Sequence, residues 1–238
     1  MSAAGVCSRR EAETLITGGH VKVNGDVVTK LGTRVLREDL VTVNGRGIKA
    51  ERRRLFLFHK PRRVVTSLSD DRGRRDVSSF IEELQVRVFP VGRLDRDVNG
   101  LVVLTNDGEF ANQMLHPSND VTRVYLAIVT GIPDEATFLK MTKGIFLEDG
   151  KARADRAMRI PESEVTRRML REVRPGEAIL RVEVSEGRNH FVKRLLARLG
   201  LPVKRLCRIE FGPFRLGQLK PGEVVELKEF PTSLKRSE

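Results

Sequence analysis

The chain has 238 residues, which is long enough for a sizeable hydrophobic core together with one small additional module. Lysine and arginine number 44 against 32 aspartate and glutamate residues, and this net charge of +12 favours a polyanionic partner, either nucleic acid or an acidic membrane surface. No stretch approaches the roughly 18 apolar residues that a membrane-spanning helix needs, and no secretory signal is evident, so neither class is indicated.

The first predicted elements are a helix and a hairpin. Ser8 followed by Glu11 is a capping-box pattern that starts a helix, and Gly18 is a residue type that ends one. Residues 21–28 alternate as two strands around Asn24-Gly25, a pair that favours a tight turn. With so few large apolar residues, this part of the chain predicts a domain that is only marginally stable alone.

Arg9, Arg10, Lys22 and Lys30 are predicted to lie on one basic face, although a merely solvated helix start fits the same spacing. Residues 4–28, AGVCSRREAETLITGGHVKVNGDVV, resemble the small S-four-type RNA-binding domain, also called the alpha-L motif. This resemblance implies that residues 1–48 form a domain that lays its helix and hairpin on structured RNA. Residues 49–54, KAERRR, predict a polar, basic linker to the remainder of the chain.

The second part of the chain opens with residues 55–58, an apolar run that predicts a buried strand. Lys60-Pro61 ends this strand, since proline cannot continue the hydrogen-bond ladder. Residues 77–84 then suggest a helix before the central stretch of the sequence.

That central stretch is Gly92 to Gly108, GRLDRDVNGLVVLTNDG. Asn99-Gly100 predicts a tight turn, and residues 101–104 form a continuous apolar run typical of a strand buried on both faces. Asp95 therefore lies in a loop that enters a rigid core strand, which is a good place to hold a reactive carboxylate still. The alternative is an aspartate that only pairs with a neighbouring arginine at the surface.

Downstream, residues 121–131 predict a strong strand whose alternation places Arg123 and Tyr125 on one face. A helix is expected at residues 133–143. A strand at 178–184 leads to the basic sequence EGRNHFVKRLL and to a helix that Gly200 ends. From the residues alone, core packing is the more common role of a strand tyrosine such as Tyr125, and solvent exposure is the more common state of a helix-start lysine such as Lys193.

Four motifs in the same order resemble the RsuA-type family of ribosomal RNA pseudouridine synthases: the Lys60-Pro61 segment, GRLD followed by NGLVVLTNDG, the strand with Tyr125, and EGRNHFVKRLL. The resemblance implies that Asp95 is the catalytic nucleophile, that the Tyr125 ring packs against the target base, and that Lys193 pairs with Asp95. A set of basic residues is expected to bind RNA: Arg9, Arg10, Lys22, Lys60, Arg93, Arg96, Arg123, Arg188 and Arg194.

The fold that the resemblance implies is α+β. Residues 55–238 would form a catalytic domain with a mixed, largely antiparallel sheet and a central cleft, attached to the small N-terminal RNA-binding domain. Cys7 and Cys207 are far apart and have no metal-ligand spacing, so free thiols are expected. The isomerisation of uridine needs neither cofactor nor metal, and the sequence contains no Walker loop or dinucleotide fingerprint.

The expected partner is ribosomal RNA or a ribosomal precursor particle, with no membrane and with a monomer when free. The compartment would be the cytoplasm in a bacterium and a mitochondrial or plastid matrix in a eukaryote. Three departures from the family pattern, Arg63 for Gly, Val98 for Thr and Phe191 for Gln, leave a competing hypothesis: a catalytically weak or inactive RNA-binding factor in ribosome assembly. A membrane-surface protein has only the net charge in its favour.

Overall fold

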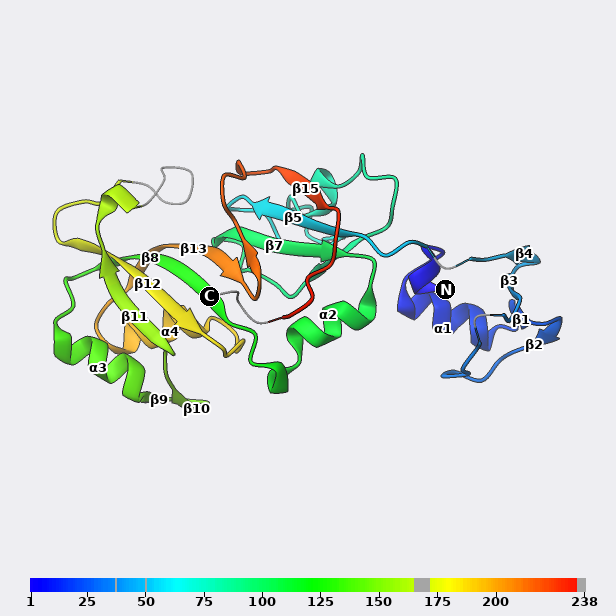
Figure 1. Cartoon of the computed structure of the whole chain (residues 1–238), viewed down its shortest axis with the longest axis horizontal. Coiled ribbons are helices and arrows are strands. Elements are labelled where there is room, and N and C mark those ends of the chain that lie inside the picture. The colour runs from blue at the N-terminus through cyan, green and yellow to red at the C-terminus, as the bar shows by residue number, and fades with distance from the viewer. Residues whose placement is uncertain (37, 50, 165–171, 235–238) are drawn as a thin grey trace. The chain divides into compact units, whose positions relative to one another are not determined.

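The computed structural model describes residues 1–36, 38–49, 51–164 and 172–234. The chain divides into two compact units, both drawn in Figure 1. Unit 1 comprises residues 1–53 together with 106–108, and unit 2 comprises residues 54–105 together with 109–238.

Unit 1 combines a helix with a small sheet. Helix α1 (Arg9–Thr17) has the predicted capping box, since the Ser8 side chain accepts from the Glu11 backbone and the Glu11 carboxylate accepts from the Ser8 backbone. The sheet order is β2-β1-β3-β4. Its strands are β1 (Val21–Val23), β2 (Asp26–Val27), β3 (Val41–Val43) and β4 (Arg46–Gly47), and a 3-10 helix, η1 (Ser2–Ala4), precedes α1.

Unit 2 is built on a mixed sheet, as the α+β prediction required. Its strands are β5 (Leu55–Lys60), β6 (Phe89–Val91), β7 (Asn99–Thr105), β8 (Arg123–Thr130), β11 (Arg156–Ile160), β12 (Glu177–Val184), β13 (Val203–Phe211), β14 (Phe214–Arg215) and β15 (Val224–Leu227). The main order is β11-β12-β8-β13-β7-β5-β15. Within the described residues only the β13–β7 pair is parallel, so the sheet is largely antiparallel.

Helices cover both faces of this sheet, because its central strands direct alternate apolar side chains to opposite sides. On one face, Val102 and Leu104 of β7 join a core with α3 (Glu135–Lys143) and α4 (Phe191–Arg198). On the other face, Leu101 and Val103 join a core with α2 (Gly108–Leu115). All seven residues of β7 are buried, which confirms the predicted strand with two buried faces.

Smaller elements complete unit 2. They are a separate hairpin of β9 (Ile145–Leu147) and β10 (Gly150–Ala152), and the 3-10 helices η2 (Ser78–Phe80), η3 (Pro117–Asn119) and η4 (Glu162–Glu164). The predicted helix at residues 77–84 was wrong, since only η2 forms there. Cys7 and Cys207 are both buried, and neither is part of a disulfide, as expected.

The predicted turn at Asn99-Gly100 was also wrong, because both residues belong to strand β7. Gly100 has φ +118°, and a Cβ built on it would lie 2.3 Å from the backbone oxygen of Arg208 on β13. Glycine is therefore required here to let two backbones approach, rather than to make a turn.

Candidate active site

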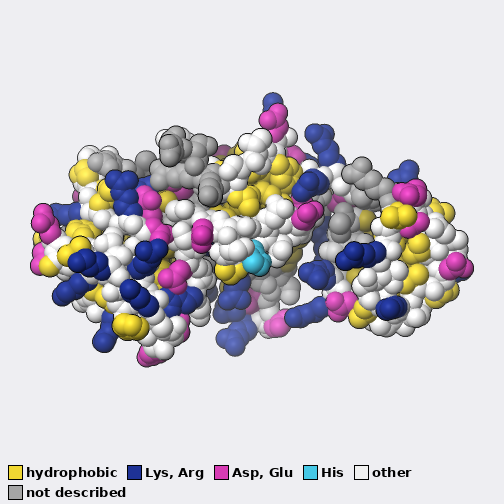
Figure 2. Space-filling view, turned by 60° about the horizontal axis from the view of Figure 1, so that its bottom comes forward, with side chains coloured by type: hydrophobic (Ala, Val, Ile, Leu, Met, Phe, Trp, Pro, Cys, Tyr) yellow, Lys and Arg dark blue, Asp and Glu magenta, His cyan; other side chains and the backbone are white. Residues whose placement is uncertain are grey.

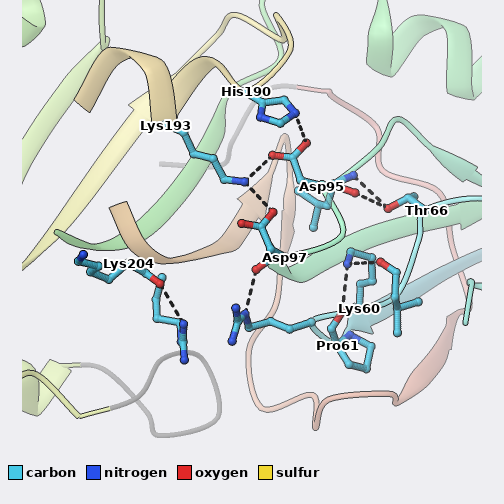
Figure 3. A network of polar contacts seen from close by, with 12 residues as sticks. Lys60, Pro61, Thr66, Asp95, Asp97, His190, Lys193 and Lys204 are labelled. Carbon is cyan, nitrogen blue, oxygen red and sulfur yellow. Dashed lines mark hydrogen bonds and ion pairs between the residues drawn. The ribbon is translucent and has the colours of Figure 1, made fainter. Parts of the chain in front are cut away.

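Asp95 lies in the loop between β6 and β7, as the sequence predicted. The loop is held from within, because the Val98 backbone donates to the Asp95 carbonyl over 3.1 Å. It is also held from outside, because the Thr66 hydroxyl donates to the Leu94 carbonyl over 2.7 Å and the Arg63 backbone donates to the Arg96 carbonyl over 2.6 Å. Figure 3 shows this support between Thr66 and the Asp95 loop.

The supporting segment explains one departure from the family pattern. Arg63 has φ +66°, so this arginine adopts the left-handed conformation that favours the glycine of the family pattern. Its backbone can then reach the Arg96 carbonyl. The strain of a non-glycine residue at this position amounts to roughly 1 kcal/mol.

Lys193 of α4 bridges two carboxylates, as Figure 3 shows. Its ammonium lies 2.8 Å from Oδ2 of Asp95 and 2.7 Å from Oδ1 of Asp97. Burial by itself lowers the pKa of Lys193, but its hydrogen bonds to Asp95 and Asp97 outweigh burial and raise that pKa. Lys193 is therefore a permanent cation beside Asp95, in the pairing that the resemblance implied.

Asp97 is a second member of this cluster that the sequence analysis did not single out. Burial, the largest single cause, raises its pKa, but the hydrogen bond and the charge of Lys193 together with the smaller contributions of a backbone hydrogen bond and of Arg62 outweigh burial and leave the pKa lowered. His190, in a left-handed conformation at the N-cap of α4, places Nε2 3.6 Å from Oδ1 of Asp95. The position of Asp97 two residues after Asp95 was a signal that could have identified it. Nothing in the sequence assigned a role to His190.

A cavity of about 330 Å³ opens beside this cluster. Asp95, Lys193 and Tyr125 all line it, so residues 95, 125 and 193, far apart in sequence, meet at one site. Val98 and Phe191, the other two departures, are both buried in the core and also line the cavity. Apolar side chains at these positions therefore shape the wall instead of leaving polar groups unpaired.

The predicted RNA-binding arginines of unit 2 differ in accessibility. Arg93 and Arg96 are exposed. Arg123 is buried, lines the cavity and donates from Nη1 to the Val121 and Ser185 carbonyls, each over 2.9 Å. Arg188 lines the cavity and Arg194 lies on α4, and both donate to the Asp149 carboxylate, over 3.0 and 2.6 Å.

The structure contradicts the role that was expected for Lys60. It was expected to bind RNA, but its side chain is fully buried and its ammonium donates to the Pro61 and Val64 carbonyls over 3.0 and 2.8 Å. Burial lowers its pKa to about 8, although the negative charges of Asp95 and Asp97 act in the opposite direction. Lys60 thus stabilises residues 61–64, whose Arg63 backbone supports the Asp95 loop. Its buried ammonium is not placed to contact a phosphate.

The three predicted RNA-binding residues of unit 1, Arg9, Arg10 and Lys22, are all exposed. Figure 2 shows lysine and arginine side chains at the surface of each unit. Among the described residues, no helix is long and apolar enough to cross a membrane, and no group of three or more His, Cys, Asp or Glu has the arrangement of a metal site.

Comparisons with known proteins agree with this geometry. A family model described as RNA pseudouridylate synthase matches residues 54–198, and a model described as S4 domain matches residues 1–41. The chain is 46% identical to an RNA pseudouridine synthase of Aquifex aeolicus, over 96% of this chain and 88% of that protein. It is 40% identical to the ribosomal large subunit pseudouridine synthase B of Bacillus subtilis, over 98% and 91% of the two chains.

A solved structure described as a pseudouridylate synthase superimposes with a TM-score of 0.63 at 26% identity, over 94% of this chain and 92% of that one. The mixed α+β architecture of unit 2 is therefore shared with this protein. The similarity extends over nearly the whole chain and includes the loop of Asp95, the strand of Tyr125 and the start of the Lys193 helix.

Proposed function

The chain belongs to the family of RNA pseudouridylate synthases, and from that premise we propose that it isomerises a specific uridine of ribosomal RNA with Asp95 as the nucleophile. The observation that supports this most is the Lys193 ammonium 2.8 Å from the Asp95 carboxylate at the wall of the cavity. A carboxylate held by a cation stays ionised and in one rotamer, which is what a covalent nucleophile needs.

The positions of Tyr125 and Lys193 support the roles that we propose for them. Tyr125, on β8, offers an aromatic ring at the cavity wall against which a flipped uracil can stack. Lys193 neutralises Asp95 and Asp97 together and so keeps two carboxylates close without mutual repulsion. Extruding the target nucleotide costs a few kcal/mol, and contacts between basic side chains and phosphates offset that cost.

We assign RNA placement to the exposed cations. Residues 1–48 would act as an S-four-type RNA-binding domain through Arg9, Arg10 and Lys22, residues 49–54 as a linker, and residues 55–238 as the catalytic domain. Arg93, Arg96 and Arg188 would contact phosphates around the cavity, with Arg123 deeper in its wall. Since the Bacillus subtilis relative is named for the ribosomal large subunit, we take large-subunit RNA, free or in a precursor particle, as the substrate of a monomeric enzyme.

The named relatives are bacterial, which favours action in the bacterial cytoplasm over an organelle. The alternative of an inactive assembly factor rested on Arg63, Val98 and Phe191. None of these side chains disturbs Asp95, Tyr125 or Lys193, so nothing in the fold favours it.

The direct test is to incubate the purified protein with unmodified transcripts of both ribosomal RNAs and with precursor particles, and then to map pseudouridine. We expect one or a few modified uridines in large-subunit RNA, and none with Asp95→Asn. Absence of pseudouridine from every substrate with the wild-type protein would overturn the proposal, and modification of small-subunit RNA alone would overturn the choice of subunit.

A further inference from the structure

Arg208, on β13, is a buried cation in the wall of the cavity. It lies in a C-terminal segment that resembles the family, but the sequence assigned it no role. Arg208 is 2% exposed, and it lines the cavity together with Asp95 and Tyr125. Nε donates to the Leu101 carbonyl over 2.9 Å, and the guanidinium carbon lies 4.6 Å from the centre of the Phe211 ring. Nη2 is buried and has no hydrogen-bond partner within the described part of the chain.

A guanidinium in this state is costly. A buried donor without an acceptor loses its hydration and gains nothing in return, and a buried charge needs a counter-charge. No carboxylate of the described residues forms an ion pair with Arg208, in contrast to Arg188 and Arg194. A buried charge with an unused donor is therefore expected to have its partner in a ligand.

The charge of Arg208 also affects two neighbouring cations. Burial is the main reason that the pKa of Arg123 is lowered, and the charge of Arg208 lowers it further. Burial likewise dominates the lowered pKa of Lys60, where Arg208 again contributes. Arg208 is thus close enough to two other buried cations to affect both, and the field of Arg123 and Arg208, which line the cavity together, favours negative charge at that wall.

The fold places Arg208 there by strand register. Arg208 lies opposite Tyr125 on one side and opposite Gly100 on the other. The approach to Gly100 leaves no room for a Cβ, so this glycine sets how closely β13 packs against the strand that follows Asp95. The register of β13 shifts between Arg208 and Glu210, and such irregularities commonly re-aim a side chain next to an active site.

We propose that Arg208 is a catalytic residue that donates to a carbonyl oxygen of the uracil ring and stabilises the negative charge of the detached base. This inference rests on the proposed function. When the bond between N1 and the ribose carbon C1′ breaks, its electron pair stays on the ring and spreads onto the carbonyl oxygens. The ring then supplies a pair to form the C5–C1′ bond, C5 loses its proton and N1 gains one, so that the reaction is an isomerisation without any co-reactant.

An RNA phosphate is the other oxygen that a guanidinium could hold. Phosphates remain at the edge of the cavity when a nucleotide is flipped, where the exposed Arg93 is available. Arg208 instead lies deep in the wall, opposite the residue expected to stack on the base. In a water-poor site, one fixed donor aimed at developing negative charge accounts for roughly 10²–10³-fold in rate.

The first experiment compares Arg208→Met and Arg208→Lys with Arg215→Met, the same substitution on an exposed arginine of β14. We expect single-turnover pseudouridine formation to fall roughly 100-fold or more in Arg208→Met and roughly tenfold in Arg208→Lys, with the Kd for RNA within about threefold of wild type. Arg215→Met should match wild type. A weaker Kd with an unchanged single-turnover rate would assign Arg208 to a phosphate and overturn the proposal.

The second experiment varies the base, with RNA transcribed from 5-fluorouridine. Fluorine withdraws electrons and stabilises the detached uracil anion. It also takes the place of the C5 proton, so that the final proton loss is blocked and the disappearance of 5-fluorouridine reports the steps before it, cleavage of the N1–C1′ bond and formation of the C5–C1′ bond. The loss of single-turnover rate in the Arg208 variants, relative to wild type, should be several-fold smaller on this RNA than on normal RNA. An equal deficit on both substrates would overturn the role in charge stabilisation and leave only a structural one.

If Arg208→Met fails to fold, as shown by its thermal transition, Arg208→Lys decides the question: wild-type rates on both RNAs would overturn the proposal. This result can be distinguished from failure of the proposed function. If the proposed function were wrong, the wild-type protein itself would form no pseudouridine.

Discussion

The cations of the two units have opposite surroundings. Around the cavity of unit 2, Lys193 and Arg123 have low exposure and named partners, and their positions are set by strands and a helix. In unit 1, Arg9, Arg10 and Lys22 are exposed on short elements over a small core. Held, poorly screened charges such as those at the cavity are suited to stabilising charge that develops during a reaction. Exposed charges such as those of unit 1 are suited to attracting a polyanion.

This comparison predicts that substitutions in the cavity change the rate of reaction, while substitutions in unit 1 change the affinity for RNA and its dependence on salt. A substitution in the cavity that mainly weakens RNA binding, or a substitution in unit 1 that slows the reaction at saturating protein, would contradict this expectation.

The largest effect is expected from Asp95→Asn. Pseudouridine formation should fall below detection, at least roughly 10³-fold, while the Kd for RNA changes little, because the amide keeps the shape but cannot act as a nucleophile. Asp71→Asn, at an exposed aspartate of the preceding loop, is the matched control and should be fully active. Undiminished product from Asp95→Asn would sink the nucleophile assignment.

Lys193→Met should lose roughly 10²-fold or more in single-turnover rate, since methionine keeps an apolar stem and removes the charge between Asp95 and Asp97. Lys193→Arg should retain activity, because a guanidinium can grip a carboxylate with two bonds. Lys143→Met, at the exposed end of α3, is the control. Equal activity of Lys193→Met and the control would show that the ion pair is dispensable.

Lys60 offers a test of burial through pH. Its pKa is lowered from 10.5 to about 8, so between these values the unfolded chain binds a proton that the folded chain has released. Stability relative to Lys60→Met should therefore be constant below pH 8 and rise as pH increases towards 10.5, by up to ~3 kcal/mol. Chemical denaturation of both proteins from pH 7 to 10 measures this difference, because every other titrating group is shared. A difference that stays flat would mean that Lys60 is hydrated in solution.

Much of this arrangement could be predicted from sequence where the signal is local. The Ser8–Glu11 capping box, the buried strand at residues 101–104 and the helix that Gly200 ends each depend on neighbouring residues, and each was found. The pairing of Asp95 with Lys193 joins distant residues and was foreseen only because the family motifs carry it.

What could not be predicted depends on tertiary contacts. Asn99-Gly100 has strong turn propensity, but the approach of β13 to Gly100 overrides it. Lys60 follows a strand and carries a charge, which suggests exposure, yet the Pro61 and Val64 carbonyls enclose its ammonium. Nothing in the alternation of residues 203–211 distinguishes Arg208 from its exposed neighbours.

In unit 1, we expect the double substitution Arg9→Gln with Arg10→Gln to weaken RNA binding by roughly tenfold at moderate salt. It should also reduce the slope of log K against log salt by about 1.5, if each arginine contacts one phosphate. Arg46→Gln, exposed on β4, is the control within the same unit. The single-turnover rate at saturating protein should not change. A slower rate at saturation would contradict the separation between the two units.

The smallest effect concerns the support of the Asp95 loop. Arg63 is exposed and has φ +66°, and its backbone donates to the Arg96 carbonyl, so the conformation is required while the side chain is not. Arg63→Gly should relieve the strain of roughly 1 kcal/mol, but the greater freedom that glycine gives the unfolded chain offsets half of this gain or more, so unit 2 should be stabilised by at most roughly 0.5 kcal/mol. Arg63→Ala is the matched control, because it removes the same side chain and keeps the strain, so it should not be stabilised. Activity should be unchanged in both, since neither alters the loop. If the glycine variant melts below the alanine variant, the left-handed conformation is not present in solution, and the Asp95 loop must be held mainly by Thr66.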